Sequence, residues 1–278
     1  MSKPTFHVRH NARPDLVQAF LELVSEYPDA DDESLIAYGA TQSSYIGTTV
    51  NSVQNMRENA AQYLRDFGVL ERGQNRLTVQ GEWLCNILFS KPALFAELMH
   101  YFFYSTWRPS NPEQNCFSWS YATTTNLLWS QAEAAVDLKR LANEVEVAAS
   151  QQFADVKVSL SADSMRGVLN WLLPLKPNVI TETGNTRHFT RRSFCPPELF
   201  VFAVDYVYQL RNIRYESNLL IEPDIQEAIC QICVLELEGF ERVADYAVLQ
   251  FPFLKRGMGG GWGSYLLLER APVLQDMQ

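Results

Sequence analysis

The chain has 278 residues, of which 47% are hydrophobic and 20% are charged, and its formal net charge is −9 at pH 7. This composition is typical of a globular protein with a full apolar core. No run of about 18 apolar residues is present, which argues against a transmembrane helix, and the opening residues lack the apolar centre of a secretory signal. The five cysteines are odd in number and scattered, which argues against a disulfide framework and agrees with a cytoplasmic location.

Apolar spacing predicts a series of helices in the first 66 residues. The first begins at Pro14, and the second follows a cap at Asp31 or Asp32 and ends at Gly39. A longer helix is predicted over 48–66. Two strand-like pieces, 69–71 and 76–79, then flank the turn 72–75, and Thr78 is placed to cap the next helix.

The rest of the chain is predicted to be mainly helical. An aromatic helix over 92–107 precedes a loop rich in proline and asparagine, and an exposed amphipathic helix is expected over 133–151. Hairpins are expected at Gly184-Asn185 and around the glycine-rich stretch 257–263. Further helices are expected over 118–130, 162–173, 196–212, 224–235 and 238–249.

The segment IGTTVNSVQNMRENAAQYLRDFGVLERGQNRLTVQGEWL resembles the winged helix-turn-helix superfamily. In that pattern a helix ends in a leucine, a glycine and an aliphatic pair, and a short hairpin leads to a Thr and a Gly that open the next helix. The matching positions are Leu64, Gly68, Val69, Leu70, Thr78 and Gly81. The resemblance covers residues 14–82, about a quarter of the chain, and implies a third helix for the major groove and a wing for the DNA backbone.

A second resemblance reaches further along the chain. The aromatic helix followed by SWSYATTTNLLW is similar to uncharacterised prokaryotic proteins encoded near phosphorothioate DNA modification and other anti-phage genes. The His-rich opening of that family is faintly echoed by FHVRHNAR. This resemblance implies a context of DNA modification and antiviral defence.

These patterns together predict a mainly α fold in three parts. We expect a winged helix-turn-helix over 1–90, an aromatic-rich helical connector over 91–155, and a helical C-terminal domain over 156–278 with hairpins that could form a second winged-helix-like unit.

Polar and basic side chains of this predicted module indicate contact with nucleic acid. Amide, hydroxyl and guanidinium groups pair with base edges, and arginines of a wing reach phosphates. A basic hairpin near 187–192 and a basic pair before the glycine-rich stretch are further candidates. The predicted nucleic-acid-binding residues are Thr49, Asn51, Ser52, Asn55, Arg57, Arg72, Gln74, Asn75, Arg76, Arg187, Arg191, Arg192, Lys255 and Arg256.

Other motifs do not indicate catalysis or a cofactor. The glycine-rich stretch lacks the Gly-Lys-Ser/Thr and the following helix of a phosphate loop, and a hairpin turn or a second wing fits it better. Cys230 and Cys233 have no second cysteine pair, so we expect buried core cysteines and no metal. His100 lies on the aromatic helix and is expected in the core. We find no nucleophile motif or metal-binding pair and predict a non-enzymatic protein with no cofactor.

Two main functions remain open from the sequence, beside a third in which an enzyme site assembles from distant acidic residues. The first is a DNA-binding protein, a regulator or the recognition subunit of a larger prokaryotic assembly, whose ligand is double-stranded DNA or another nucleic acid. The second is an interaction subunit whose winged helix is a scaffold, with exposed aromatics at 101–107 facing a protein partner or a second copy. The acidic net charge and the balanced charge of 48–82 favour the second; a continuous basic strip joining Arg57, Arg72, Arg76 and 187–192 would favour the first.

Overall fold

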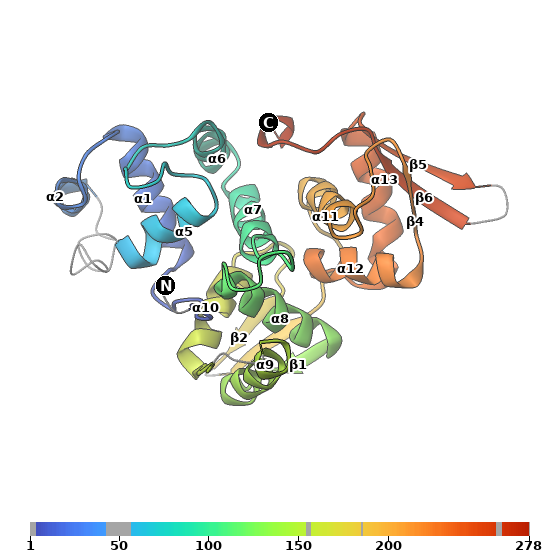
Figure 1. Cartoon of the computed structure of the whole chain (residues 1–278), viewed down its shortest axis with the longest axis horizontal. Helices are drawn as coiled ribbons and strands as arrows, with labels where there is room; N and C mark the ends of the chain where they lie inside the picture. The colour runs from blue at the N-terminus through green and yellow to red at the C-terminus, as the bar shows by residue number, and fades with distance from the viewer. Residues whose placement is uncertain (1–3, 43–56, 154–156, 185, 260–262, 278) are drawn as a thin grey trace.

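The computed structural model describes residues 4–42, 57–153, 157–184, 186–259 and 263–277. Its fold is mainly α with two small antiparallel sheets, as predicted. Figure 1 shows the N-terminal helices on one side and the C-terminal helices on the other, with helix α7 (Pro92–Ser105) between them. No described helix is long and apolar enough to cross a membrane. The division into three domains stays a prediction.

The first helices begin as the sequence predicts. Helix α1 (Pro14–Glu26) has its proline in the first turn. Helix α2 (Asp32–Gln42) follows Asp31, whose carboxylate accepts a hydrogen bond from the Ser34 N–H at 2.7 Å. The expected end at Gly39 is wrong, because the helix continues to residue 42; a glycine inside a helix costs only about 1 kcal/mol.

The predicted third helix is only partly covered by the described residues. Residues 48–56 lie outside them, and the chain resumes in a π-helical turn, η1 (Arg57–Ala61), that continues as α5 (Gln62–Asp66). We therefore describe the end of this element only.

The hairpin after α5 is shorter than expected. One bridge joins Leu70 to Leu77, and the Thr78 N–H donates to the Val69 carbonyl at 3.0 Å. The two predicted strands do not extend further, because Thr78 already caps helix α6 (Val79–Ser90) by accepting from the Gly81 N–H at 3.1 Å. A Cβ at Gly81 would lie 2.1 Å from the Val69 carbonyl oxygen, so this close approach requires glycine. We call residues 69–78 the α5–α6 hairpin.

Helix α7 lies at the centre of the molecule. It contacts α6, α8 (Cys116–Ser130), α10 (Ala162–Leu172) and α11 (Pro197–Leu210). Tyr101, Phe103 and Tyr104 are buried, which corrects the expectation of an exposed aromatic surface over 101–107. A helix that is apolar on nearly every side is a core helix.

Two polar side chains of α7 are also buried, and both have partners from distant segments. Glu97 forms an ion pair with Arg192, with oxygen–nitrogen distances of 2.7 and 2.9 Å. His100 lies 2.7 Å from both the Tyr121 hydroxyl and the Ile232 carbonyl. Burial lowers the pKa of His100 to about 4, so the ring is neutral at pH 7. The prediction that His100 is a core residue is confirmed.

The first sheet joins distant parts of the chain in the order β1-β3-β2. Its strands are β1 (Glu133–Ala135), β2 (Ile180–Thr183) and β3 (Thr186–Thr190), and the β2–β3 hairpin turns at the predicted place. The expected helix over 133–151 begins only at residue 138, as α9 (Leu138–Gln152). Asp137 caps that helix, and the residues before it pair with β3 instead.

The C-terminal helices pack against a second sheet. Helices α12 (Pro223–Cys233) and α13 (Phe240–Gln250) accompany β4 (Asn218–Leu220), β5 (Leu254–Gly259) and β6 (Gly263–Leu268), in the order β4-β6-β5. The predicted glycine-rich hairpin is therefore a β5–β6 pair, with 260–262 outside the described residues. The short helix η3 (Leu274–Met277) returns to α6, where the Lys91 ammonium donates to the Met277 carbonyl at 2.9 Å.

Candidate nucleic-acid interface

An arm over residues 4–12 precedes the first helix, with alternating burial over 5–9 and a turn at 10–11. Phe6 and Val8 are buried, whereas His7, Arg9 and His10 are exposed. Successive side chains of an extended backbone point to opposite sides. One side of the arm is therefore anchored in the core, and the other presents basic and imidazole groups to solvent.

Several contacts fix this arm on helices α5 and α10. The Tyr63 hydroxyl donates to the His7 carbonyl at 3.1 Å and accepts from the Arg9 N–H at 3.0 Å. The Asn170 amide donates to the His10 carbonyl at 3.0 Å. A Cβ at Gly167 would lie 1.9 Å from the Val8 carbonyl oxygen, so the arm lies directly on the backbone of α10. These contacts give His7 and Arg9 a defined position.

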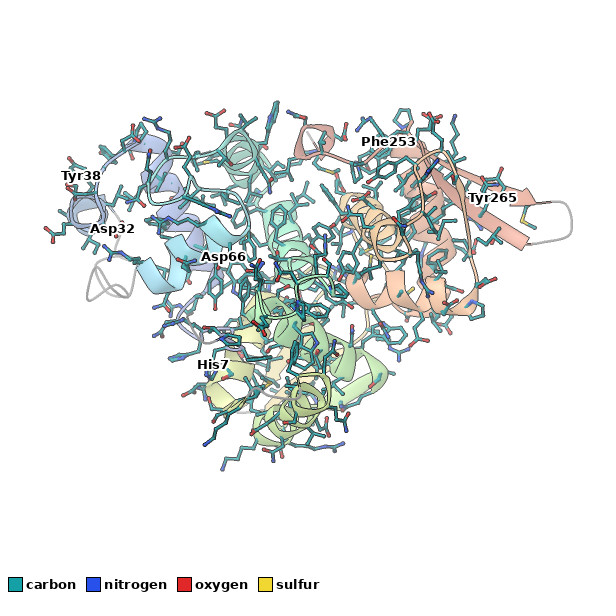
Figure 2. The ribbon with its side chains drawn as sticks, in the orientation of Figure 1. His7, Asp32, Tyr38, Asp66, Phe253 and Tyr265 are labelled. Carbon is teal, nitrogen blue, oxygen red and sulfur yellow. The ribbon has the colours of Figure 1, made fainter. Side chains whose placement is uncertain are left out.

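A polar cavity of about 820 Å³ opens beside the arm. It lies between the arm, α5, the turn of the α5–α6 hairpin and the loop that precedes α8. We call it the arm groove. Figure 2 labels His7 on the arm and Asp66 at the end of α5, both of which line it. Its charged or imidazole-bearing lining residues are His7, Arg9, Arg57, Arg65, Asp66, Arg72 and Glu113.

The arginines of the arm groove outnumber its carboxylates and differ in how they are held. Arg57 pairs with Asp32 at 2.9 Å but keeps 60% of its side chain exposed. Arg65 donates to the Asn75 side-chain oxygen at 2.9 Å, which orients its guanidinium. Arg72 is exposed on the hairpin turn. Guanidinium groups fixed in this way suit the oxygens of a phosphate.

The titrating groups of the arm groove add little positive charge. Burial and the neighbouring Arg9 lower the pKa of His7, so its ring is neutral at pH 7. Burial raises the pKa of the Asp66 carboxyl, and burial raises the pKa of the Tyr63 hydroxyl to about 12. The positive potential of the arm groove therefore comes from its arginines.

A second cavity, of about 330 Å³, continues along the same arm. It shares His7 and Arg9 with the arm groove and reaches the start of α10. There His7 Nδ1 lies 2.6 Å from the Ser164 hydroxyl oxygen. The buried Asn59 and the exposed His10 also line it. The polar surface thus follows the arm on both sides of His7.

The nucleic-acid contacts predicted on the third helix and the hairpin do not all lie in the arm groove. Arg57 and Arg72 line the arm groove, whereas Arg76 pairs with Asp29 at 2.9 and 2.6 Å. Gln74 is exposed. Asn75 is buried and donates to the Ala30 carbonyl and the Asp32 carboxylate. It therefore supports the hairpin and is not available to contact nucleic acid. Outside the described residues lie Thr49, Asn51, Ser52 and Asn55.

The remaining predicted arginines belong to the first sheet and its neighbours. Arg187 pairs with Glu182 at 2.8 Å, and the Arg191 guanidinium lies 3.8 Å from the Trp129 ring centroid. Arg192 is completely buried in its pair with Glu97 and is likewise not available to contact nucleic acid. None of the three lines the arm groove, so the basic strip expected between the hairpin and 187–192 is not formed by the described residues.

The basic pair on β5 is engaged in ion pairs. Lys255 contacts Glu269, and Arg256 contacts both Asp245 and Glu241. These contacts tie the strand to its neighbours and to α13. Their positive charge is largely neutralised within the fold.

Two arginines of the arm groove, Arg9 and Arg65, are not among the residues predicted from the sequence. Arg9 had a usable signal, since apolar and polar residues alternate through FHVRH. Arg65 had no such signal, because its position depends on how α5 meets the arm and the hairpin.

The described residues hold no cluster of three or more His, Cys, Asp or Glu side chains able to bind a metal ion. All five cysteines are free and buried, as expected for Cys230 and Cys233.

Comparison with known proteins shows a similarity of fold. No protein-family model matches the chain, and no curated protein matches it. A solved structure described as magnesium ion-bound SspB superposes with a TM-score of 0.55 at 14% identity, covering 95% of this chain and 83% of that one. A second SspB crystal structure gives a TM-score of 0.55 at 15% identity, covering 92% and 83%.

The chain has the fold of SspB. This likeness extends over nearly all of its length. It does not support membership of the winged helix superfamily, which covers a quarter of the chain at most.

Proposed function

We propose that this protein binds double-stranded DNA through the arm groove and is not itself an enzyme. The observation that carries the proposal is the meeting of Arg9, Arg57, Arg65 and Arg72 in one cavity, although they come from three separated segments. Arginines placed around a groove neutralise phosphates and displace their counterions. Thr49, Asn51, Ser52 and Asn55 remain the proposed base contacts, since amides and hydroxyls pair with base edges.

We place this activity in a larger cytoplasmic assembly of a prokaryote. The sequence resembles proteins encoded near phosphorothioate DNA modification and anti-phage genes, and the SspB fold supports that resemblance over nearly the whole chain. The net charge of −9 argues against binding DNA non-specifically along its whole length. A recognition subunit with one local basic groove fits both observations better than a coating protein.

Fluorescence anisotropy over a salt series tests the proposal. Labelled duplex DNA, single-stranded DNA and RNA are titrated with the protein and with an Arg9→Ala/Arg72→Ala variant. We expect duplex binding that weakens with salt, and a logarithmic salt slope that is smaller by about 2 in the variant, since about one unit is lost for each phosphate contact.

The control removes two arginines that lie outside the arm groove. Arg140 and Arg211 are 70% and 52% exposed and each pairs with a carboxylate. An Arg140→Ala/Arg211→Ala variant loses the same charge and should bind as the wild type does. Equal losses in both variants, or no binding of any nucleic acid at low salt, would refute the proposal.

An interaction scaffold is the second candidate. Its supporting observation is an apolar cavity of about 310 Å³ between α6, α7, α11 and the last described residues. Val79 and Val273 line it and are 68% and 42% exposed. Failure of all nucleic acids to bind would favour this candidate, with a protein partner or a second copy at this cavity.

A further inference from the structure

A separate cavity of about 260 Å³ lies where helices α7, α8, α11 and α12 meet. These helices contact one another in the pairs α7–α8, α7–α11, α8–α12 and α11–α12. Figure 1 shows α8 and α12 on the two sides of this junction. The cavity shares no lining residue with the arm groove. We call it the aromatic pocket.

Aromatic rings form much of its wall. Tyr104, Trp119 and Tyr206 are 6%, 6% and 7% exposed, and Trp107 is half-buried. All four residues line the cavity, and Trp107 keeps the largest exposed fraction among them. Tyr104 and Tyr206 meet edge to face, with centroids 6.2 Å apart. Such rings offer stacking and edge contacts to a flat ligand.

The polar groups of the wall lie on α8 and α12 and keep hydrogen-bonding capacity. Asn126 lines the cavity and accepts from the Tyr104 hydroxyl at 2.7 Å, which assigns its oxygen and leaves its NH₂ group as a donor. The Gln231 NH₂ donates to Glu227 at 3.0 Å, which leaves its oxygen as an acceptor. Thr123 also lines the cavity. The wall therefore presents both a donor and an acceptor.

The charge of the wall restricts the occupant. Among the described residues that line the pocket there is no Asp, Glu, Lys or Arg. A free phosphate or an alkylammonium group would therefore meet no opposite charge on the lining side chains themselves. Two charges adjoin the wall and are already engaged. Glu227 accepts from Gln231 at 3.0 Å, and the Arg108 guanidinium lies 4.8 Å from the Tyr206 ring centroid and donates to Gln209 at 3.0 Å. The pocket suits a neutral, flat group with donors and acceptors along its edge.

We infer that the aromatic pocket binds a nucleobase, stacked on its rings and held at its edge by Asn126 and Gln231. Side-chain amides pair with base edges through one donor and one acceptor, and aromatic walls bind unstacked bases. The base comes either from a free nucleotide or from a strand. The inference does not depend on DNA binding at the arm groove, because the two sites share no residue.

Saturation-transfer NMR on the intact protein tests the inference with adenosine, guanosine, cytidine and thymidine as probes. We expect at least one nucleoside to bind, and inorganic phosphate not to compete with it. An Ala228→Phe variant fills the pocket from α12 and should abolish the signal. Gln231→Ala removes one hydrogen bond at the edge and should weaken binding about three- to tenfold.

A matched control lies on the same helix. Gln226 also makes one side-chain hydrogen bond, to the Leu237 carbonyl at 3.1 Å, but does not line the pocket. Gln226→Ala should bind nucleosides as the wild type does. If Ala228→Phe fails to fold, the pair Gln231→Ala and Gln226→Ala still decides the result.

The outcomes separate this site from the arm groove. Nucleoside binding that persists in the Arg9→Ala/Arg72→Ala variant and is lost in Ala228→Phe would support the inference. Displacement by a single-stranded oligonucleotide would identify a strand as the source of the base, and persistence would identify a free nucleotide. No transfer from any nucleoside, or equal transfer in wild type and Ala228→Phe, would overturn it.

Discussion

At the centre of the fold, Glu97 and Arg192 form an ion pair whose side chains are 1% and 0% exposed. Arg192 also donates to the carbonyls of Cys233 and Lys176, so its guanidinium is well satisfied. A buried pair of this kind adds little net stability over apolar residues, but removal of one partner leaves an uncompensated charge and costs about 3–5 kcal/mol. Arg192 was predicted from the sequence to contact phosphate, because its true partner Glu97 lies 95 positions away and no local pattern indicates the pair.

His100 should make the protein sensitive to moderate acid. Its pKa is about 4 in the folded state against 6.5 for an exposed histidine, because burial disfavours the charged ring. The unfolded chain therefore takes up a proton first as the pH falls below 6.5. The stability that depends on the neutral ring is fully present above that pH and is lost progressively toward pH 4, by up to about 3 kcal/mol.

Urea unfolding of the wild type and a His100→Gln variant between pH 4 and 7 measures this loss. The variant should be less stable than the wild type at pH 7. It should lose less of its free energy of unfolding than the wild type does between pH 7 and pH 4. Parallel pH profiles for the two proteins would contradict the assignment.

Among the secondary-structure elements, those with local signals could be predicted and those with distant partners could not. Pro14 opens α1, Thr78 caps α6, and Gly184 turns the β2–β3 hairpin, as their sequence context indicates. Strand β1 escaped prediction because it pairs with β3, more than fifty residues later. The burial of the aromatic side chains of α7 was not predicted, although a helix that is apolar on nearly every side indicates a core helix.

The contact between the arm and α10 should depend on Gly167. A Gly167→Ala substitution would place a methyl group 1.9 Å from the Val8 carbonyl oxygen and so push the arm off the helix. We expect a loss of about 1–3 kcal/mol, against the gain of up to about 1 kcal/mol that alanine usually gives inside a helix. Hydrogen exchange of the Arg9 amide, now bonded to Tyr63, should become faster.

Gly184→Ala provides the control for this variant. Gly184 has a φ of 61° and no neighbouring atom within 4 Å, so alanine there costs backbone strain without touching the arm. Its Arg9 amide should remain protected. Unchanged exchange in Gly167→Ala would show that the arm is not held at this point.

For the whole molecule, the sequence predicted a mainly α chain but not which distant segments contact one another. The order of helices and hairpins follows from periodicity and turn residues, which are local. The return of η3 to α6 depends on a contact between Lys91 and Met277, 186 positions apart, and no local pattern encodes it. For the same reason the arm groove could be foreseen only through Arg57 and Arg72, and the aromatic pocket not at all.

The returning segment should stabilise the junction between the N-terminal helices and the rest. Leu274 is 7% exposed and its neighbour Val273 is 42% exposed. We expect Leu274→Ala to lower the free energy of unfolding by about 2–4 kcal/mol, and Val273→Ala to change it by less than about 0.5 kcal/mol. Guanidinium unfolding of both variants measures the difference, and similar small losses would show that the segment rests only loosely on α6.

The partners of α7 have a consequence for biosynthesis. The helix leaves the ribosome with Glu97 and His100, yet Arg192 and the Ile232 carbonyl follow 95 and 132 residues later. Translation at about 5–20 residues per second therefore leaves this helix for several seconds without the groups that neutralise and pair its polar atoms. The core cannot close domain by domain during that time, so the nascent chain is most exposed to chaperones and proteases in its middle third.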